Sequence, residues 1–153
     1  DPMHQAGLKN MLATGDLHRL GLMDWILGHD DRHAGNYLMT PNGKKEMQLI
    51  DNSEILPSFN PVTNFYTPDY LSRNDGLKKP IHDNEQDWVS SLDPEHLTGS
   101  LAKMNYPKAT IKATEDRLNF LKRLIHDKRG QGQQLTGNDI FDHDMDDSEE
   151  RPW

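Results

Sequence analysis

Two short apolar runs separated by a turn signal constrain the fold of this chain more than any other feature. The runs are residues 37–39 (YLM) and 47–50 (MQLI), and residues 40–43 between them (TPNG) are of the types that favour turns. This pattern predicts a β-hairpin, in which the residue before the first strand and the residue after the second lie close together. Both flanking residues are polar here, since Asn36 precedes the first run and Asp51 follows the second.

A third polar residue, Asp31, stands five positions before Asn36 on the segment that leads into the hairpin. Its carboxylate could orient or deprotonate a hydroxyl group. Asn36 and Asp51 carry the hard oxygen atoms that Mg²⁺ or Mn²⁺ prefers. The spacing therefore predicts a metal-dependent phosphoryl-transfer site.

Two motifs in this region carry a resemblance to a known family. Residues 31–36 (DRHAGN) resemble the D-R-H-x-x-N catalytic loop of the phosphatidylinositol 3-/4-kinase-like superfamily, and residues 50–52 (IDN) resemble its metal-binding I-D-N segment. The bacterial and phage-type members and the type II phosphatidylinositol 4-kinases are the most similar. The wider resemblance covers residues 1–129 and implies the C-terminal lobe of a kinase, a phosphotransferase that depends on ATP and Mg²⁺.

The resemblance also implies roles for single residues. Asp31 is the expected catalytic carboxylate, and Asn36 and Asp51 are the expected ligands of the metal and its bound nucleotide. His33 matches a histidine that is a candidate base or phosphate contact, and it could equally pack against the loop backbone. Arg32 is expected to hold the loop by pairing with an acid.

Residues 29–33 (HDDRH) also fit a different kind of site. They read H-D-x-x-H, a variant of the zinc-hydrolase motif in which His29 and His33 would bind zinc from one face of a helix. Gly28 and Gly35 bracket the segment and disfavour a helix there, and no third ligand follows at a familiar distance. Zinc hydrolysis is therefore the minor alternative.

Apolar spacing predicts that the remainder of the chain is mostly helical. We expect helices over residues 3–13, 17–27, 85–92, 94–104 and 107–128. The expected fold class is α+β, a mostly helical kinase-like C-terminal lobe with a β-hairpin that carries the metal-binding site. Residues 52–80 are interrupted by prolines and predict a long loop, at the position of an activation or substrate-recognition segment.

The charge distribution predicts two parts, a lobe over residues 1–129 and a flexible acidic tail over residues 130–153. Seven carboxylates against one arginine in residues 137–153 account for −6 of the formal net charge of −8. The lobe itself is near neutral and has no stripe of Lys and Arg, so we expect no nucleic-acid partner. Absence of cysteine and of a long apolar run favours a cytoplasmic location with no transmembrane segment.

The sequence before Asp31 lacks the other half of a kinase. It is predicted to be helical and contains no Gly-rich phosphate loop. We therefore expect an N-terminal lobe to come from upstream sequence or from another chain, and we expect this chain alone to be inactive. The alternative function is a non-catalytic interaction or assembly component built on a kinase-like lobe. The acceptor, whether lipid, protein or small molecule, stays open at this point.

Overall fold

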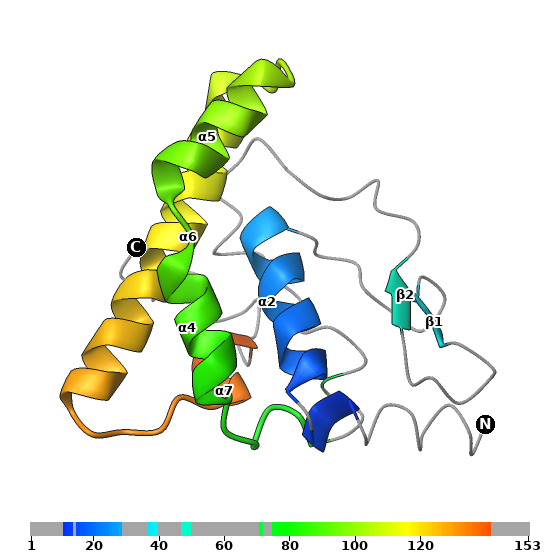
Figure 1. Ribbon diagram of the computed structural model, residues 1–153, viewed down its shortest axis with the longest axis vertical. Helices are drawn as coiled ribbons and strands as arrows, with labels where there is room; N and C mark the ends of the chain where they lie inside the picture. The colour runs from blue at the N-terminus through cyan, green and yellow to red at the C-terminus, as the bar shows by residue number, and fades with distance from the viewer. Residues whose placement is uncertain are drawn as a thin grey trace, which may run out of the picture.

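The computed structural model describes residues 11–13, 15–28, 37–39, 47–49, 71 and 75–141, and this part of the chain is mostly helical (Figure 1). In chain order the elements are α2 (Asp16–Leu27), β1 (Tyr37–Met39), β2 (Met47–Leu49), α4 (Asp83–Ser91), α5 (Pro94–Lys103), α6 (Lys108–Gly130) and α7 (Gly137–Phe141). The mostly helical character expected from the sequence is confirmed. The metal-binding residues assigned to the hairpin lie outside the described residues.

The long helix α6 is the element against which the other helices pack. Figure 1 shows α4 and α5 following one another along α6, with α2 beside α4. One face of α6 is apolar and fully buried, and it includes Leu118, Leu121 and Ile125. Trp25 of α2 stacks on Phe120 of α6 with ring centroids 5.6 Å apart. Burial of this face places α2 firmly against α6.

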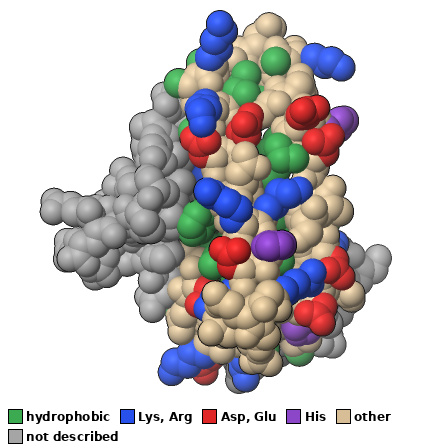
Figure 2. All heavy atoms as spheres, turned by 90° about the vertical axis from the view of Figure 1, so that its left-hand side faces the viewer, with side chains coloured by type: hydrophobic (Ala, Val, Ile, Leu, Met, Phe, Trp, Pro, Cys, Tyr) green, Lys and Arg blue, Asp and Glu red, His purple; other side chains and the backbone are tan. Residues whose placement is uncertain are grey.

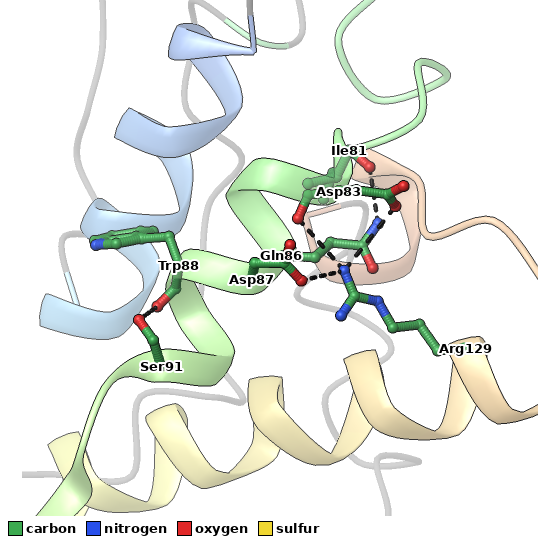
Figure 3. Close-up of polar contacts among 7 residues, drawn as sticks. All are labelled: Ile81, Asp83, Gln86, Asp87, Trp88, Ser91 and Arg129. Carbon is green, nitrogen blue, oxygen red and sulfur yellow. Dashed lines mark hydrogen bonds and ion pairs between the residues drawn. The ribbon is translucent and has the colours of Figure 1, made fainter.

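Polar contacts tie the start of α4 to the end of α6 (Figure 3). The Nη2 group of Arg129 donates to the backbone oxygen of Asp83 at 3.3 Å and lies 2.8 Å from a carboxylate oxygen of Asp87. In the same turn, the side-chain amide of Gln86 donates to the carbonyl of Ile81 at 2.8 Å. These contacts fix the angle at which α4 leaves the preceding loop.

The corner between α4 and α5 is closed by side chains at both helix ends. The ammonium group of Lys122 donates to the carbonyls of Ser90 and Leu92, which the end of α4 leaves without helical partners. Asp93 then caps α5 by accepting the backbone N–H of Glu95 at 3.0 Å, with Pro94 at the first helical position. The helix start predicted at this point is confirmed.

The strands β1 and β2 form an antiparallel pair. Tyr37 lies opposite Leu49, Leu38 opposite Gln48, and Met39 opposite Met47. These strands correspond to the two apolar runs of the sequence. The turn between them lies outside the described residues.

The packed core extends beyond residue 129. Leu135, Ile140 and Phe141 are at most 2% exposed and belong to the same apolar cluster as the helices. The backbone N–H of Ile81 donates to the carbonyl of Leu135 at 2.8 Å, so the segment after α6 pairs with the segment before α4. A flexible tail from residue 130 is therefore wrong for residues 131–141, because their apolar side chains fill the base of the core. Residues 142–153 lie outside the described part.

Charges on the surface are mixed. On the face shown in Figure 2, Lys and Arg side chains alternate with Asp and Glu, and neither sign forms a continuous area. Among the helices that the structure describes, none combines the length and the apolar character that crossing a bilayer requires.

Candidate active site

The residues that the sequence assigns to catalysis and metal binding lie outside the described residues. These are Asp31, Arg32, His33, Asn36 and Asp51, together with His29 of the zinc alternative. The structure describes the elements that flank these residues in the sequence. Helix α2 and its cap end at Gly28, one position before His29, and β1 begins at Tyr37, one position after Asn36.

The register of the hairpin bears on the two expected metal ligands. Tyr37 and Leu49 are paired across the strands. Asn36 precedes Tyr37 directly in the sequence, and Asp51 follows Leu49 by two positions. Paired residues of antiparallel strands have Cα atoms about 4.5–5.5 Å apart. Chain connectivity therefore limits how far apart Asn36 and Asp51 can be.

The C-terminal end of α2, from which the candidate catalytic loop departs, is held in two ways. Gly28 adopts a left-handed conformation (φ 75°) that favours glycine, and its N–H points back to the carbonyls of Asp24 and Trp25. The next carbonyl, that of Ile26, accepts a hydrogen bond of 2.7 Å from Nε of Arg117 on α6. A backbone turn and a side chain from a distant helix thus share the capping of α2.

Arg117 is a fully buried cation. Its Nη2 group donates to the hydroxyl of Thr114 at 3.1 Å, and that hydroxyl donates to the carbonyl of Thr110 at 2.9 Å. Burial lowers the pKa of Arg117 to about 10, which leaves the guanidinium charged at neutral pH. Its contact with α2 is made at the end of the helix where the macrodipole is negative, so the electrostatic interaction is favourable.

Two further polar contacts fix the N-terminal half of α2. The buried ring of His18 donates through Nε2 to the carbonyl of Gly76 at 2.8 Å. Arg19 forms an ion pair with Glu85 of α4 (Nε to Oε2, 2.6 Å), and its guanidinium lies 5.1 Å from the centre of the Trp88 ring. Helix α2 is therefore connected to α4, to α6 and to the turn before α4.

Sequence reasoning missed Arg117, although the sequence contains a signal for it. Thr114 and Arg117 share the buried face of α6 with Leu118 and Leu121. An arginine inside an otherwise buried stripe needs acceptors, and that requirement predicts a polar structural contact. Its partner, a backbone carbonyl 91 positions earlier, has no signature in the sequence.

An apolar groove of about 230 Å³ lies beside the C-terminal half of α2, between that helix, α4 and α5. It is lined by Met23, Ile26, Leu27, Trp88, Leu92, Asp93, His96, Leu97 and Ser100. None of these is a lysine or arginine, so the groove does not offer the cationic contacts that nucleotide phosphates require. Within the described part of the chain, no group of three or more His, Asp or Glu side chains could hold a metal ion either.

A buried helix packed on further helices, followed in the chain by an antiparallel pair of strands, is compatible with a kinase-like lobe, and the comparison with protein families identifies the chain as one. The family model described as phosphatidylinositol 3- and 4-kinase matches residues 9–129. Because this match spans well over half of the sequence, the chain belongs to the phosphatidylinositol 3- and 4-kinase family. Searches of curated proteins and of solved structures found no match.

Proposed function

We propose that this chain is the catalytic lobe of an ATP- and Mg²⁺-dependent phosphotransferase. The observation that carries the proposal is the family match over residues 9–129, which includes every residue assigned to the site. Within the family, the D-R-H-x-x-N and I-D-N motifs favour the bacterial and phage-type members or the type II phosphatidylinositol 4-kinases. A cytoplasmic location belongs to the same proposal.

The chemistry of the expected ligands fits a magnesium–nucleotide complex. One carboxylate and one amide oxygen, from Asp51 and Asn36, are hard ligands of the type that Mg²⁺ takes. Bound there, Mg²⁺ would neutralise charge on the β- and γ-phosphates. In this proposal Asp31 orients the acceptor hydroxyl and takes its proton, His33 assists, and Arg32 holds the loop.

The strand pair and the capped end of α2 support these roles for Asp31, Asn36 and Asp51. The Tyr37–Leu49 pair keeps the residues adjoining both strands close to one another, and the capped end of α2 fixes where the loop begins. The phosphate loop and the lysine that complete a kinase nucleotide site have no counterpart in the sequence before Asp31. We propose that an N-terminal lobe, encoded upstream or on another chain, supplies them.

The decisive experiment measures Mg²⁺-dependent transfer of phosphate from ATP by the lobe assembled with its N-terminal partner. Candidate acceptors are phosphatidylinositol vesicles, protein and small alcohols. Asp51→Asn should lower turnover by about 10²–10³-fold, because a neutral amide cannot balance the phosphate charge. Asn36→Ala should raise the Mg²⁺ concentration required, and Asp31→Ala should lower turnover while nucleotide binding is kept.

Asp116→Asn is the matched control, because Asp116 lies on the outer face of α6 in an exposed ion pair with Lys112. It should leave turnover unchanged. If Asp51→Asn also leaves turnover unchanged, the phosphotransferase proposal is wrong and a non-catalytic interaction or assembly component takes its place. Stoichiometric zinc in the purified protein would instead support the alternative hypothesis of a zinc hydrolase, in which His29 and His33 bind the metal.

A further inference from the structure

We propose that Arg117 is a positioning residue for the candidate catalytic loop over residues 29–36. Its buried guanidinium holds the carbonyl of Ile26 and thereby fixes the point from which the loop leaves α2. The inference rests on the proposed function, because it assigns to Arg117 an effect on turnover. Arg117 acts through the helix end and the loop, without touching substrate.

The hydrogen bonds of Arg117 hold its guanidinium at the C-terminal end of α2. Nε donates to Ile26 and Nη2 donates to Thr114 on the preceding turn of α6, so the planar guanidinium is oriented by both helices. Nη1 is buried and has no hydrogen-bond partner among the residues that the structure describes. The side chain therefore depends on the α2 carbonyl for its strongest contact.

Electrostatic interactions also favour contact between Arg117 and the end of α2. No carboxylate among the described residues forms an ion pair with Arg117, and the attraction of the exposed Asp116 offsets the unfavourable burial of the charge only in part. The partial negative charge at the end of α2 supplies a further favourable interaction with the buried cation. A movement of this helix end away from α6 would leave the cation without that charge, so the two helices resist separation at the point where the loop begins.

Asp31 follows Ile26 by five positions, so a small rotation at the end of α2 is carried into the loop. Displacement of a catalytic group by ~1 Å, caused by a change away from the chemistry, can lower turnover by ~10²-fold. Substrate binding is affected much less by such a displacement when most of its contacts lie elsewhere. A positioning role therefore predicts a change in kcat that exceeds the change in KM.

The first test compares amide hydrogen exchange in the full chain, well below its melting temperature, for Arg117→Met and Arg117→Lys. Peptides covering residues 28–36 should exchange about fivefold faster in Arg117→Met, with α5 unchanged. Arg117→Lys should fall between this variant and the wild type, because lysine keeps the charge but lacks the planar group that bonds to two acceptors. If the methionine variant does not fold, the lysine variant alone carries the test.

Two control variants separate positioning from general destabilisation. Arg123→Met changes an exposed residue of the same helix and should behave as the wild type. Leu118→Ala removes a fully buried side chain next to Arg117 but keeps the guanidinium that donates to Ile26. Any faster exchange in Leu118→Ala should appear in α5 as much as in residues 28–36.

The second test uses the lobe assembled with its N-terminal partner. Arg117→Met should lower kcat for phosphoryl transfer about tenfold while KM for ATP stays within about twofold, and Arg117→Lys should restore part of kcat. Equal acceleration of exchange in residues 28–36 and in α5 would overturn the positioning role. Absence of phosphoryl transfer in the wild type would instead overturn the proposed function, and the exchange pattern would still decide the role of Arg117.

Discussion

At the scale of single residues, two buried basic side chains connect α2 to distant parts of the chain, and they respond to pH in different ways. Arg117 stays charged across the neutral range despite its lowered pKa of about 10. His18 is buried at 1% exposure, and burial lowers its pKa below the ordinary value of 6.5. The folded lobe therefore favours neutral His18, and stability should depend on pH through this residue.

We predict that the free energy of unfolding falls as the pH is lowered from 6.5 toward the lowered pKa of His18. In that window the unfolded chain binds more protons than the folded chain, so stability rises with pH. The contribution is fully present above pH 6.5, and it is lost at up to about 1.4 kcal/mol per pH unit below that value. Urea unfolding measured between pH 5 and pH 8 checks this.

His18→Gln should reduce the slope, because a neutral amide can donate to Gly76 without titrating. His126→Gln is the control, since the side chain of His126 is 88% exposed, and the slope should stay that of the wild type. An unchanged slope in His18→Gln would assign the pH dependence to other groups.

At the scale of elements, α2 approaches its neighbours so closely that a glycine is required within the helix. A Cβ at Gly21 would lie 2.7 Å from Cδ1 of Leu71 and 3.1 Å from the ring of Phe141. Leu71 is fully buried, so its side chain has little space into which it could move. At Gly99 of α5, by contrast, a Cβ would meet nothing within 4 Å.

We predict opposite effects for the same substitution at these two glycines. Gly99→Ala should raise the free energy of unfolding by about 0.5–1 kcal/mol, because alanine is the better helix former. Gly21→Ala should lower it by about 1–2 kcal/mol, because overpacking in the core outweighs the same propensity gain. Thermal unfolding of both variants is the measurement, and stabilisation by Gly21→Ala would show that Leu71 and Phe141 can repack.

Local sequence pattern predicted α2 and the helices from α4 to α6 because each has an apolar stripe or a clear start signal. The Asp93-Pro94 start and the stripe through Leu118, Leu121 and Ile125 are examples. Pattern did not predict that Gly21 faces Phe141, since that approach joins segments 120 positions apart in the sequence. Contacts of this kind depend on how helices dock, and the sequence does not encode them locally.

At the scale of the whole molecule, the segment after α6 turns back and closes the base of the lobe. Pro80 and Thr136 form an isolated antiparallel bridge, and Thr136 in turn donates its N–H to the carboxylate of Asp139 at 2.8 Å. Ile140 and Phe141 then enter the core. The sequence did not predict this, because the polar run over residues 130–134 is typical of a linker and the three apolar residues beyond it form no single stripe.

We predict that a chain ending at residue 130 melts at least ~10 °C below a chain ending at residue 141. The shorter chain loses three buried side chains, each worth about 1.5–3 kcal/mol of burial. The melting temperature of a domain of this size changes by ~2–4 °C per kcal/mol. Circular dichroism during heating is the measurement.

Phe141→Ala provides a milder version of the same test, with an expected loss of about 3–5 kcal/mol. Removal of residues 142–153, which contain few apolar side chains, should change the melting temperature by only ~2 °C or less. Equal melting temperatures for the chains ending at 130 and 141 would contradict the packing of α7.

The candidate site was predicted on a different basis from the fold. Asp31, Asn36 and Asp51 were identified because phosphoryl transfer requires those residue types in that order around a hairpin. The family match includes all three positions. Arg117 was not identified, because its role depends on a hydrogen bond to a backbone carbonyl rather than on a motif.

The bond between Arg117 and Ile26 has a consequence for the order of events during synthesis. Arg117 lies 91 residues after Ile26 in the sequence. At ~5–20 residues per second, the ribosome therefore adds Arg117 roughly 5–20 s after Ile26. Once Asn36 has been added, the nascent chain contains the whole DRHAGN motif, while the cation that anchors the end of the preceding helix does not yet exist. A prematurely terminated product that lacks α6 would therefore carry the catalytic motif without the support that orients it, and we expect such products to be inert.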